Sequence, residues 1–239
     1  MKLFNFLIHS VLPGKCMFCD KYMRFEIKAP YCTRCREELP FKEEKRCLLC
    51  SRQIDGEGNI KLCKICSANK MYFDANYSPF NYEGSVEDAI KRFKFADRSW
   101  YGGHFAKFIG DELMKERIKA DYIVYPPVNR KTYIERGYNQ SEILAKKLSK
   151  ILGIPVVKNA IRKTRDNPKQ SLQSYKTRFS NVRGVFAVKE SKKNIIKDKR
   201  ILIIDDILTT GATLSECAKV LKRSGAKSVI SATVATTRR

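Results

Sequence analysis

Two adjacent aspartates, Asp205 and Asp206, directly follow Ile201–Ile204, a run of apolar residues that is typical of a buried strand. Like charges at neighbouring positions repel each other and lower the stability of a fold unless a ligand uses them. In an open α/β sheet, ligands bind beyond the carboxyl ends of the strands, where this pair is expected to lie. The vicinal hydroxyls of a ribose are suitable ligands, because each carboxylate can accept a hydrogen bond while a nearby Mg²⁺ offsets the charge.

A short turn follows the aspartates and leads into an amphipathic helix. Its glycine allows a close backbone approach, and the amides and threonine hydroxyls can hold a phosphate at the positive end of the helix. The order along the chain therefore suits a ribose 5-phosphate. A plain strand–turn–helix with a threonine N-cap would explain the threonines but not the two acids. The turn consists of Thr209, Thr210, Gly211, Ala212 and Thr213.

Eight of the nine cysteines fall into four pairs, each with two residues between its members. Twelve residues separate the first pair from the second and the third from the fourth, so the segment is a repeat of C-x2-C-x12-C-x2-C. Two thiolates at this spacing can meet one metal ion, and two such pairs close a tetrahedral zinc site. The predicted ligands are Cys16, Cys19, Cys32, Cys35, Cys47, Cys50, Cys63 and Cys66.

Two structural Zn²⁺ ions are the preferred interpretation, and disulfides and iron–sulfur clusters are the alternatives. Disulfides fit poorly with a chain that shows no secretion signal, and the spacing differs from that of ferredoxins. The pairs can combine sequentially or crossed, and the repeated spacing favours the sequential arrangement. Four thiolates leave no coordination position open to water, which indicates a scaffolding role for the metal. Cys217 stands apart and is expected in the core.

Beyond residue 70 the sequence alternates between strand and helix patterns, which predicts a largely parallel sheet flanked by helices. Helices are expected at 86–93, at 105–118 and after Asn139, which has capping-box spacing to Glu142. Strands are expected within 72–84 and at 121–125, 154–157, 184–188, 201–205 and 228–235. We expect two domains, a short helix with the cysteine repeat at 1–70 and the α/β domain at 71–239.

The chain is strongly basic, with 48 Lys and Arg against 25 Asp and Glu and a net charge of +23. Such an excess favours polyanions as partners, nucleic acid first and an anionic membrane second. Between Val128 and Arg183 there are 14 basic and 3 acidic residues, with aromatic residues among them. Cations with interleaved aromatic residues are typical of single-strand binding, although the aromatics can instead be core and the cations merely solvated. The nucleic-acid candidates are Arg130, Lys131, Tyr133, Arg136, Arg165, Lys169, Lys176 and Arg178.

The segment ILIIDDILTTGAT closely resembles the phosphoribosyl-pyrophosphate (PRPP) motif of type I phosphoribosyltransferases. The whole chain resembles the ComF family, in which a double zinc ribbon precedes a phosphoribosyltransferase-like α/β domain. Further matching features are the cysteine pairs, KRFKF at 91–95, PPVNRKTYIERGYNQ from Pro126, and Gln170, Arg178, Asn181 and Phe186. Tyr138 stands where phenylalanine is more usual in this family.

The resemblance implies that Asp205 and Asp206 bind the ribose hydroxyls of Mg²⁺-bound PRPP and that the threonine turn binds its 5-phosphate. It places the pyrophosphate on the turn that ends at Lys131, and the basic residues there can serve either a pyrophosphate or a DNA backbone. The pyrophosphate candidates are Pro127, Val128, Asn129, Arg130, Lys131 and Arg136.

Three functions are considered. The first, which the resemblance implies, is a cytoplasmic protein of natural competence that binds Mg²⁺·PRPP and imported single-stranded DNA. The second is a PRPP-dependent phosphoribosyltransferase with an unknown acceptor and no role in DNA handling. The third is a scaffold whose ribbons dock a helicase or translocation partner, which leaves the aspartates unexplained. No apolar run approaches the ~20 residues that span a bilayer, so no membrane span is expected.

Overall fold

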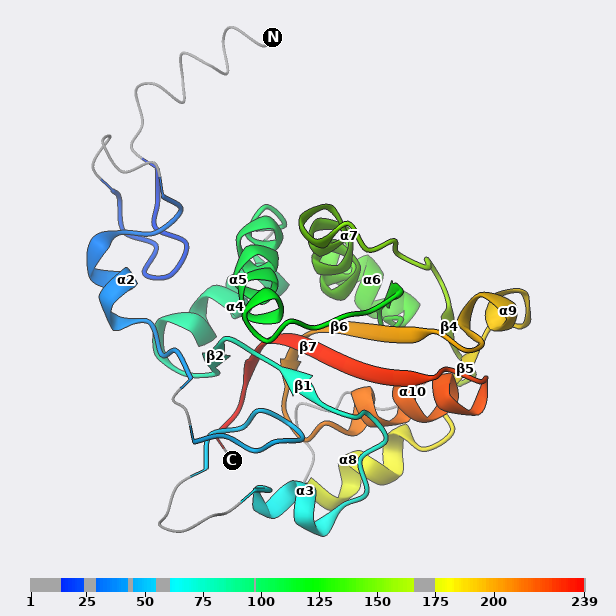
Figure 1. The fold of residues 1–239 in the computed structure, drawn as a ribbon. Coiled ribbons are helices and arrows are strands. Elements are labelled where there is room, and N and C mark those ends of the chain that lie inside the picture. The colour runs from blue at the N-terminus through cyan, green and yellow to red at the C-terminus, as the bar shows by residue number, and fades with distance from the viewer. Residues whose placement is uncertain are drawn as a thin grey trace, which may run out of the picture.

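The computed structural model describes residues 14–23, 29–42, 45–54, 61–96, 98–165 and 175–238. Its centre is a five-stranded parallel sheet with the order β1-β7-β6-β3, in which β2 also pairs with β7 (Figure 1). The strands are β1 (Asn76–Tyr77), β2 (Phe80–Asn81), β3 (Tyr122–Val124), β6 (Arg200–Leu208) and β7 (Ser228–Thr236). The expected parallel sheet is therefore confirmed, while the short helix expected ahead of the cysteine repeat lies outside the described residues.

The central strand β6 is buried on both faces, as its unbroken apolar run predicts. Ile201 and Ile203 belong to one core cluster and Leu202 and Ile204 to the other, because successive side chains of a strand point to opposite faces. In register, Ile203 lies beside Val124 of β3 on one side and Ser231 of β7 on the other. The two aspartates follow Ile204 in the same strand, so the sheet fixes the position of their backbone.

Helices cover both faces of the sheet. On one face α4 (Gly84–Phe95), α5 (Tyr101–Lys115) and α7 (Gln140–Leu152) pack on Leu202 and Ile204, and on the other α10 (Ala212–Arg223) packs on Ile201 and Ile203 (Figure 1). Asn139 caps α7 by accepting hydrogen bonds from the amides of Ser141 and Glu142. None of the helices in the described part of the chain is long and apolar enough to cross a membrane.

Shorter elements complete the described structure. The segment 154–157, expected to be a strand, makes only a single bridge from Val156 to Ile123. The run at 184–188 does form β5 (Phe186–Val188), but β5 pairs antiparallel with the unpredicted β4 (Ile161–Lys163) in a separate small sheet. The remaining elements are α2 (Thr33–Glu38), α3 (Lys64–Ala68), α6 (Arg130–Arg136), α8 (Tyr175–Val182), η2 (Glu190–Lys192) and α9 (Lys193–Ile196).

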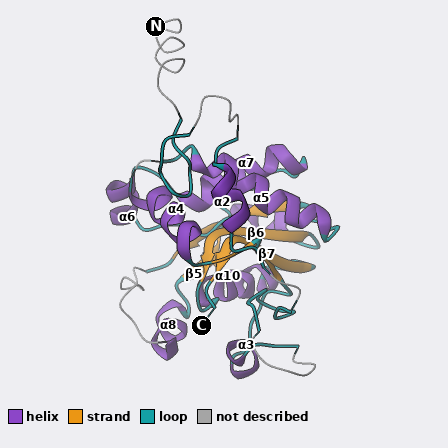
Figure 2. Ribbon diagram, turned by 90° about the vertical axis from the view of Figure 1, so that its left-hand side faces the viewer, coloured by secondary structure: helices purple, strands orange, loops and turns teal. Residues whose placement is uncertain are grey.

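The two halves of the cysteine repeat pack against different core clusters, and Figures 1 and 2 show α2 and α3 far apart on the molecule. The first ribbon, which carries the cysteines from Cys16 to Cys35, shares a cluster with α4 and α5. Arg92 of α4 donates hydrogen bonds to the carbonyls of Met17 and Phe18 in this ribbon. The second ribbon, which carries the cysteines from Cys47 to Cys66, shares a cluster with α10 and β6.

Helices α5 and α7 approach closely at Gly102, where a Cβ would clash with Cγ2 of Ile143. The neighbouring Gly103 faces open space, with nothing within 4 Å of such a Cβ. We predict that Gly102→Ala lowers the free energy of unfolding by about 1–3 kcal/mol through overpacking. Gly103→Ala is the matched control and should raise it by roughly 0.5–1 kcal/mol through helix propensity. Urea unfolding of the zinc-loaded variants measures both, and a Gly102→Ala variant as stable as the parent would contradict this packing.

Candidate functional site

A cleft of about 550 Å³ opens at the carboxyl end of β6, between that strand, the start of α10 and the segments around α6 and α7. It is not filled by side chains, and all seven predicted residues of the aspartate–threonine segment line it. Four of the six pyrophosphate candidates also line it, whereas Arg130 and Lys131 are exposed on α6 outside the lining. The residues in the lining are Pro127, Val128, Asn129, Arg136, Asp205, Asp206, Thr209, Thr210, Gly211, Ala212 and Thr213.

Each aspartate is held by a different partner. Oδ1 of Asp205 accepts a hydrogen bond from Oγ of Ser141 (2.7 Å) and another from the amide of Asp206 (2.9 Å). Oδ1 of Asp206 lies 3.0 Å from Nζ of Lys94, which reaches the cleft from the end of α4. Lys94 offsets part of the repulsion between the two carboxylates, but a single lysine does not neutralise both of them.

Burial is the main cause that raises the pKa of Asp205 to about 6, and the negative charge of Asp206 raises it further. The hydrogen bond from Ser141 and the positive charge of Lys94 act in the opposite direction. The carboxylate of Asp205 is therefore costly to ionise. A ligand that donates hydrogen bonds to it, or a cation bound beside it, would relieve this cost.

The turn after β6 presents the start of α10 to the cleft. Gly211, the N-cap residue, adopts a left-handed conformation with φ of 82° and has no side chain that would cover the first-turn amides. Oγ1 of Thr210 accepts a hydrogen bond from the amide of Ala212 (3.2 Å), which stabilises the turn. An anion can thus approach the positive end of a twelve-residue helix.

Arg136 enters the cleft from the end of α6. Its guanidinium carbon lies 4.8 Å from the ring centroid of Phe95, and its Nη1 donates to Oε1 of Gln140 (3.1 Å). Asn129 begins α6 and accepts a hydrogen bond from the amide of Thr132 (2.7 Å). The helix thus fixes the cation of Arg136 at the cleft. Tyr133 of the same helix is 51% exposed.

Among the remaining nucleic-acid candidates, the structure describes the side chain of Arg165 alone. Arg165 is exposed and donates to the carbonyl of Arg183 (2.9 Å), Lys169 lies outside the described residues, and only the backbone of Lys176 and Arg178 in α8 is described. Tyr138 is half-buried against Phe93 and donates its hydroxyl to the carbonyl of that residue, so it packs against the core.

Lys94, Phe95 and Ser141 are among the cleft side chains for which no local sequence signal predicts a role. Lys94 and Phe95 end the KRFKF segment, and Ser141 follows the YNQ segment. Both segments match the family pattern, but the pattern alone gives these three residues no role. Their proximity to the aspartates depends on the packing of α4 and α7 against β6, which no local spacing reveals.

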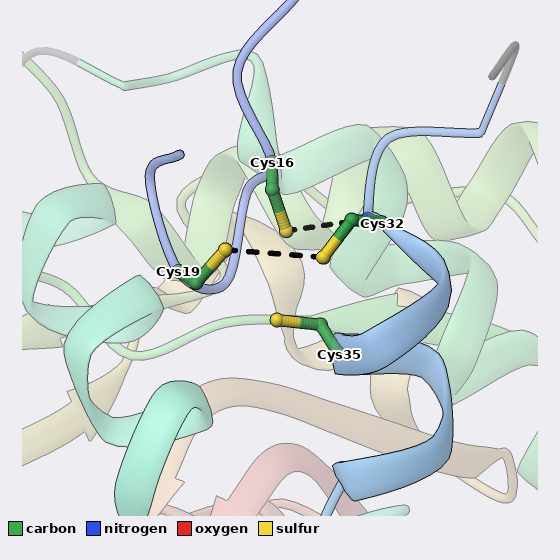
Figure 3. A group of neighbouring side chains, drawn as sticks. All are labelled: Cys16, Cys19, Cys32 and Cys35. Carbon is green, nitrogen blue, oxygen red and sulfur yellow. Dashed lines mark hydrogen bonds between the residues drawn. The ribbon is translucent and has the colours of Figure 1, made fainter. Parts of the chain in front are cut away.

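The eight paired cysteines form two clusters, and each cluster combines neighbouring pairs along the chain. In each, the four Sγ atoms lie within 4.8 Å of one another, and the first is drawn in Figure 3. Four sulfurs at ~2.3 Å from one zinc ion would lie about 3.8 Å apart. Sγ of Cys19 is 3.9 Å from that of Cys32, and Sγ of Cys50 is 3.6 Å from that of Cys63.

None of these cysteines forms a disulfide, and their spacing fits a tetrahedral ion in both clusters. The sequential arrangement of the pairs is the one that the structure shows. The donor set of four thiols supports structural zinc, whose role here is to hold two loops of chain that contain little secondary structure.

Comparisons with known proteins agree with this architecture. Residues 7–69 match the model of the double zinc ribbon domain, and residues 138–239 match that of the phosphoribosyl transferase domain. Competence protein F of Haemophilus influenzae is 26% identical over 241 residues, which cover 96% of this chain and 96% of the relative. The chain thus has a homologue named as a competence protein along nearly its whole length, and it combines a double zinc ribbon with a phosphoribosyl transferase domain.

Two further relatives are similar over most of their length. Competence protein ComFC of Bacillus subtilis is 23% identical over 238 residues, covering 94% of each chain. DNA utilization protein YhgH of Salmonella typhimurium is 24% identical over 217 residues, covering 83% of this chain and 93% of the relative. The expected combination of a double zinc ribbon with a type I phosphoribosyltransferase fold is thus confirmed for this chain.

The raised pKa of Asp205 gives a test of the site by pH. Its value of about 6 exceeds the usual value near 3.9 of an unfolded chain, so the folded state retains the proton longer and loses stability as it ionises. Between pH 5.5 and 7.5 the parent should therefore lose on the order of 1 kcal/mol of unfolding free energy relative to Asp205→Asn.

Asp121→Asn is the matched control for this measurement. Hydrogen bonds from Arg200 lower the pKa of Asp121 to about 2, so this carboxylate stays ionised throughout the window. The difference in unfolding free energy between Asp121→Asn and the parent should be the same at pH 5.5 and at pH 7.5. Urea unfolding of zinc-loaded proteins measures the differences, and equal pH dependence of the parent and Asp205→Asn would contradict a raised pKa.

Proposed function

We propose that this ComF-family protein binds Mg²⁺·PRPP in the cleft at the carboxyl end of β6. The observation that carries the proposal is the order of groups along one wall: two carboxylates lie near the carboxyl end of the strand, and a glycine turn and helix N-terminus follow it. Asp205 and Asp206 would accept hydrogen bonds from the ribose hydroxyls. The amides and hydroxyls between Thr209 and Thr213 would hold the 5-phosphate.

The opposite wall suits the pyrophosphate. The segment from Pro127 to Asn129 lines it, and Arg136 supplies a cation that Gln140 and Phe95 hold in place. Lys94 is positioned to compensate the carboxylates when a polyanion enters. Mg²⁺ would bind through ligand oxygens beside the aspartates, because hard cations prefer carboxylate and phosphate oxygens.

We further propose that the protein binds single-stranded DNA and acts in DNA uptake in the cytoplasm. Three observations support this proposal: relatives of similar length are named as competence and DNA utilization proteins, the net charge is +23, and α6 carries exposed cations next to the cleft. Arg130 and Lys131 would contact phosphates, and Tyr133 would offer a face for a base.

Replacing both carboxylates tests the PRPP site. We predict that Asp205→Asn combined with Asp206→Asn lowers the affinity for Mg²⁺·PRPP at least a hundredfold in calorimetric titration, because both ribose acceptors lose their charge. The zinc content should stay at two ions per chain, since none of the eight cysteines lines the cleft that holds the two aspartates. The matched control Asp111→Asn, an exposed carboxylate on α5, should bind like the parent. Parent-like affinity in the double variant would overturn the assignment.

Salt dependence tests the DNA surface. Counterion release from a single strand gives a slope of about −0.7 in log affinity against log salt for each neutralised phosphate. Arg130→Ala combined with Lys131→Ala should therefore make the slope shallower by about 1.4, measured by anisotropy of a labelled oligothymidine. Lys147→Ala with Lys150→Ala removes two exposed cations of α7 and should leave the slope nearly unchanged. A binding constant of the parent that does not vary with salt would contradict the proposal.

A further inference from the structure

The second zinc ribbon contacts the threonine turn through one buried arginine. Arg52 lies two residues after the zinc-ligand candidate Cys50, is only 2% exposed, and donates from Nη2 to the backbone carbonyl of Thr209. The knuckle, which is the tight turn at 47–52, fixes the position of this arginine. The amide of Cys47 donates to the carbonyl of Arg52 (2.7 Å), and the carbonyl of Cys47 accepts a hydrogen bond from the amide of Ser51 (2.9 Å). The conformation of the ribbon is thus linked directly to the first residue of the turn.

The segment 71–73, which follows the second ribbon, packs against the same turn. Sulfur and carbon atoms of Met71 and Phe73 lie 3.6 Å from the position that a Cβ of Gly211 would occupy. The amide of Tyr72 donates to Oγ of Ser215 in the first turn of α10 (3.1 Å). The ribbon, its exit segment and the turn therefore form one packed unit on the face of the sheet that α10 covers.

Favourable packing alone does not explain why an arginine is buried at position 52. Its Nε and Nη1 are buried with no hydrogen-bond partner among the described residues, and unsatisfied buried donors lower the stability of a fold. Arg52 does not line the cleft, so it reaches the turn from the opposite side. In a trans peptide the carbonyl and the following amide point in opposite directions. Holding the carbonyl of Thr209 therefore directs the amide of Thr210 away from Arg52, toward the cleft.

We infer that Arg52 is a positioning residue through which the second zinc site sets the conformation of the turn between Thr209 and Thr213. The effect of this positioning on the binding of a phosphorylated sugar rests on the proposed function. Zinc fixes the knuckle, the knuckle fixes Arg52, and the arginine orients turn amides for a phosphate while placing a positive charge behind them. The first ribbon makes no such contact in the described part of the chain, since its hydrogen bonds to the α/β domain come from Arg92.

The test compares two arginines of the same ribbon. Arg52→Ala removes the contact with the turn, and Arg46→Ala removes ion pairs with Glu112 of α5 and with Glu116, which directly follows that helix. Amide hydrogen exchange of the ligand-free, zinc-loaded protein should accelerate at least tenfold at residues 209–213 in Arg52→Ala and stay unchanged there in Arg46→Ala. Affinity for ribose 5-phosphate should fall about tenfold only in Arg52→Ala, whereas affinity for inorganic pyrophosphate should stay within twofold of the parent.

Each outcome decides the inference. Parent-like exchange of the turn in Arg52→Ala overturns it, and so does an equal acceleration in Arg46→Ala, which would indicate only general loosening of the ribbon. If Arg52→Ala loses zinc, Arg52→Lys replaces it, because it retains a donor and should restore slow exchange at least in part. Hydrogen exchange needs no ligand, so a parent protein that binds neither ribose 5-phosphate nor PRPP would refute the proposed function while exchange still decides the role of Arg52.

Discussion

The placement of two carboxylates near the carboxyl end of a strand that is buried on both faces is the constraint on which the rest of the structure depends. Because β6 lies between β3 and β7, the backbone of Asp205 and Asp206 cannot move apart to relieve their repulsion. The fold responds with a serine from α7 and a lysine from α4, each directed at one of the two. The result is a negatively charged, partly compensated corner beside a positive helix end, and this pairing of opposite potentials suits a sugar phosphate better than a simple anion.

The double zinc ribbon has a second consequence for this corner. Ribbons of this size contain too few apolar residues to fold on a core of their own, so the metal supplies much of their folding free energy. Here their buried cysteines belong to the two core clusters of the α/β domain, one on each face of the sheet. The first ribbon packs near α4, which supplies Lys94, and the second packs beneath the threonine turn. Both walls of the cleft are thus supported by segments that zinc holds in place.

Much of this arrangement could be predicted from the sequence, because its signals are local. Apolar runs gave the strands of the main sheet, fixed cysteine spacings gave both clusters, and the aspartates with their turn lie within one short segment. The parts that could not be predicted depend on distant contacts. The apolar run at 184–188 does not reveal that β5 belongs to a separate antiparallel sheet. Likewise Ser141 is 64 residues from Asp205, and Arg52 is 157 residues from Thr209.

The most direct test of the account is a crystal structure of the zinc-loaded protein with Mg²⁺ and PRPP. The account predicts ribose hydroxyls at hydrogen-bond distance, ~2.6–3.0 Å, from the carboxylates of Asp205 and Asp206, and the 5-phosphate on the amides between Thr209 and Thr213. PRPP bound elsewhere on the molecule, or bound with its 5-phosphate away from this turn, would contradict it.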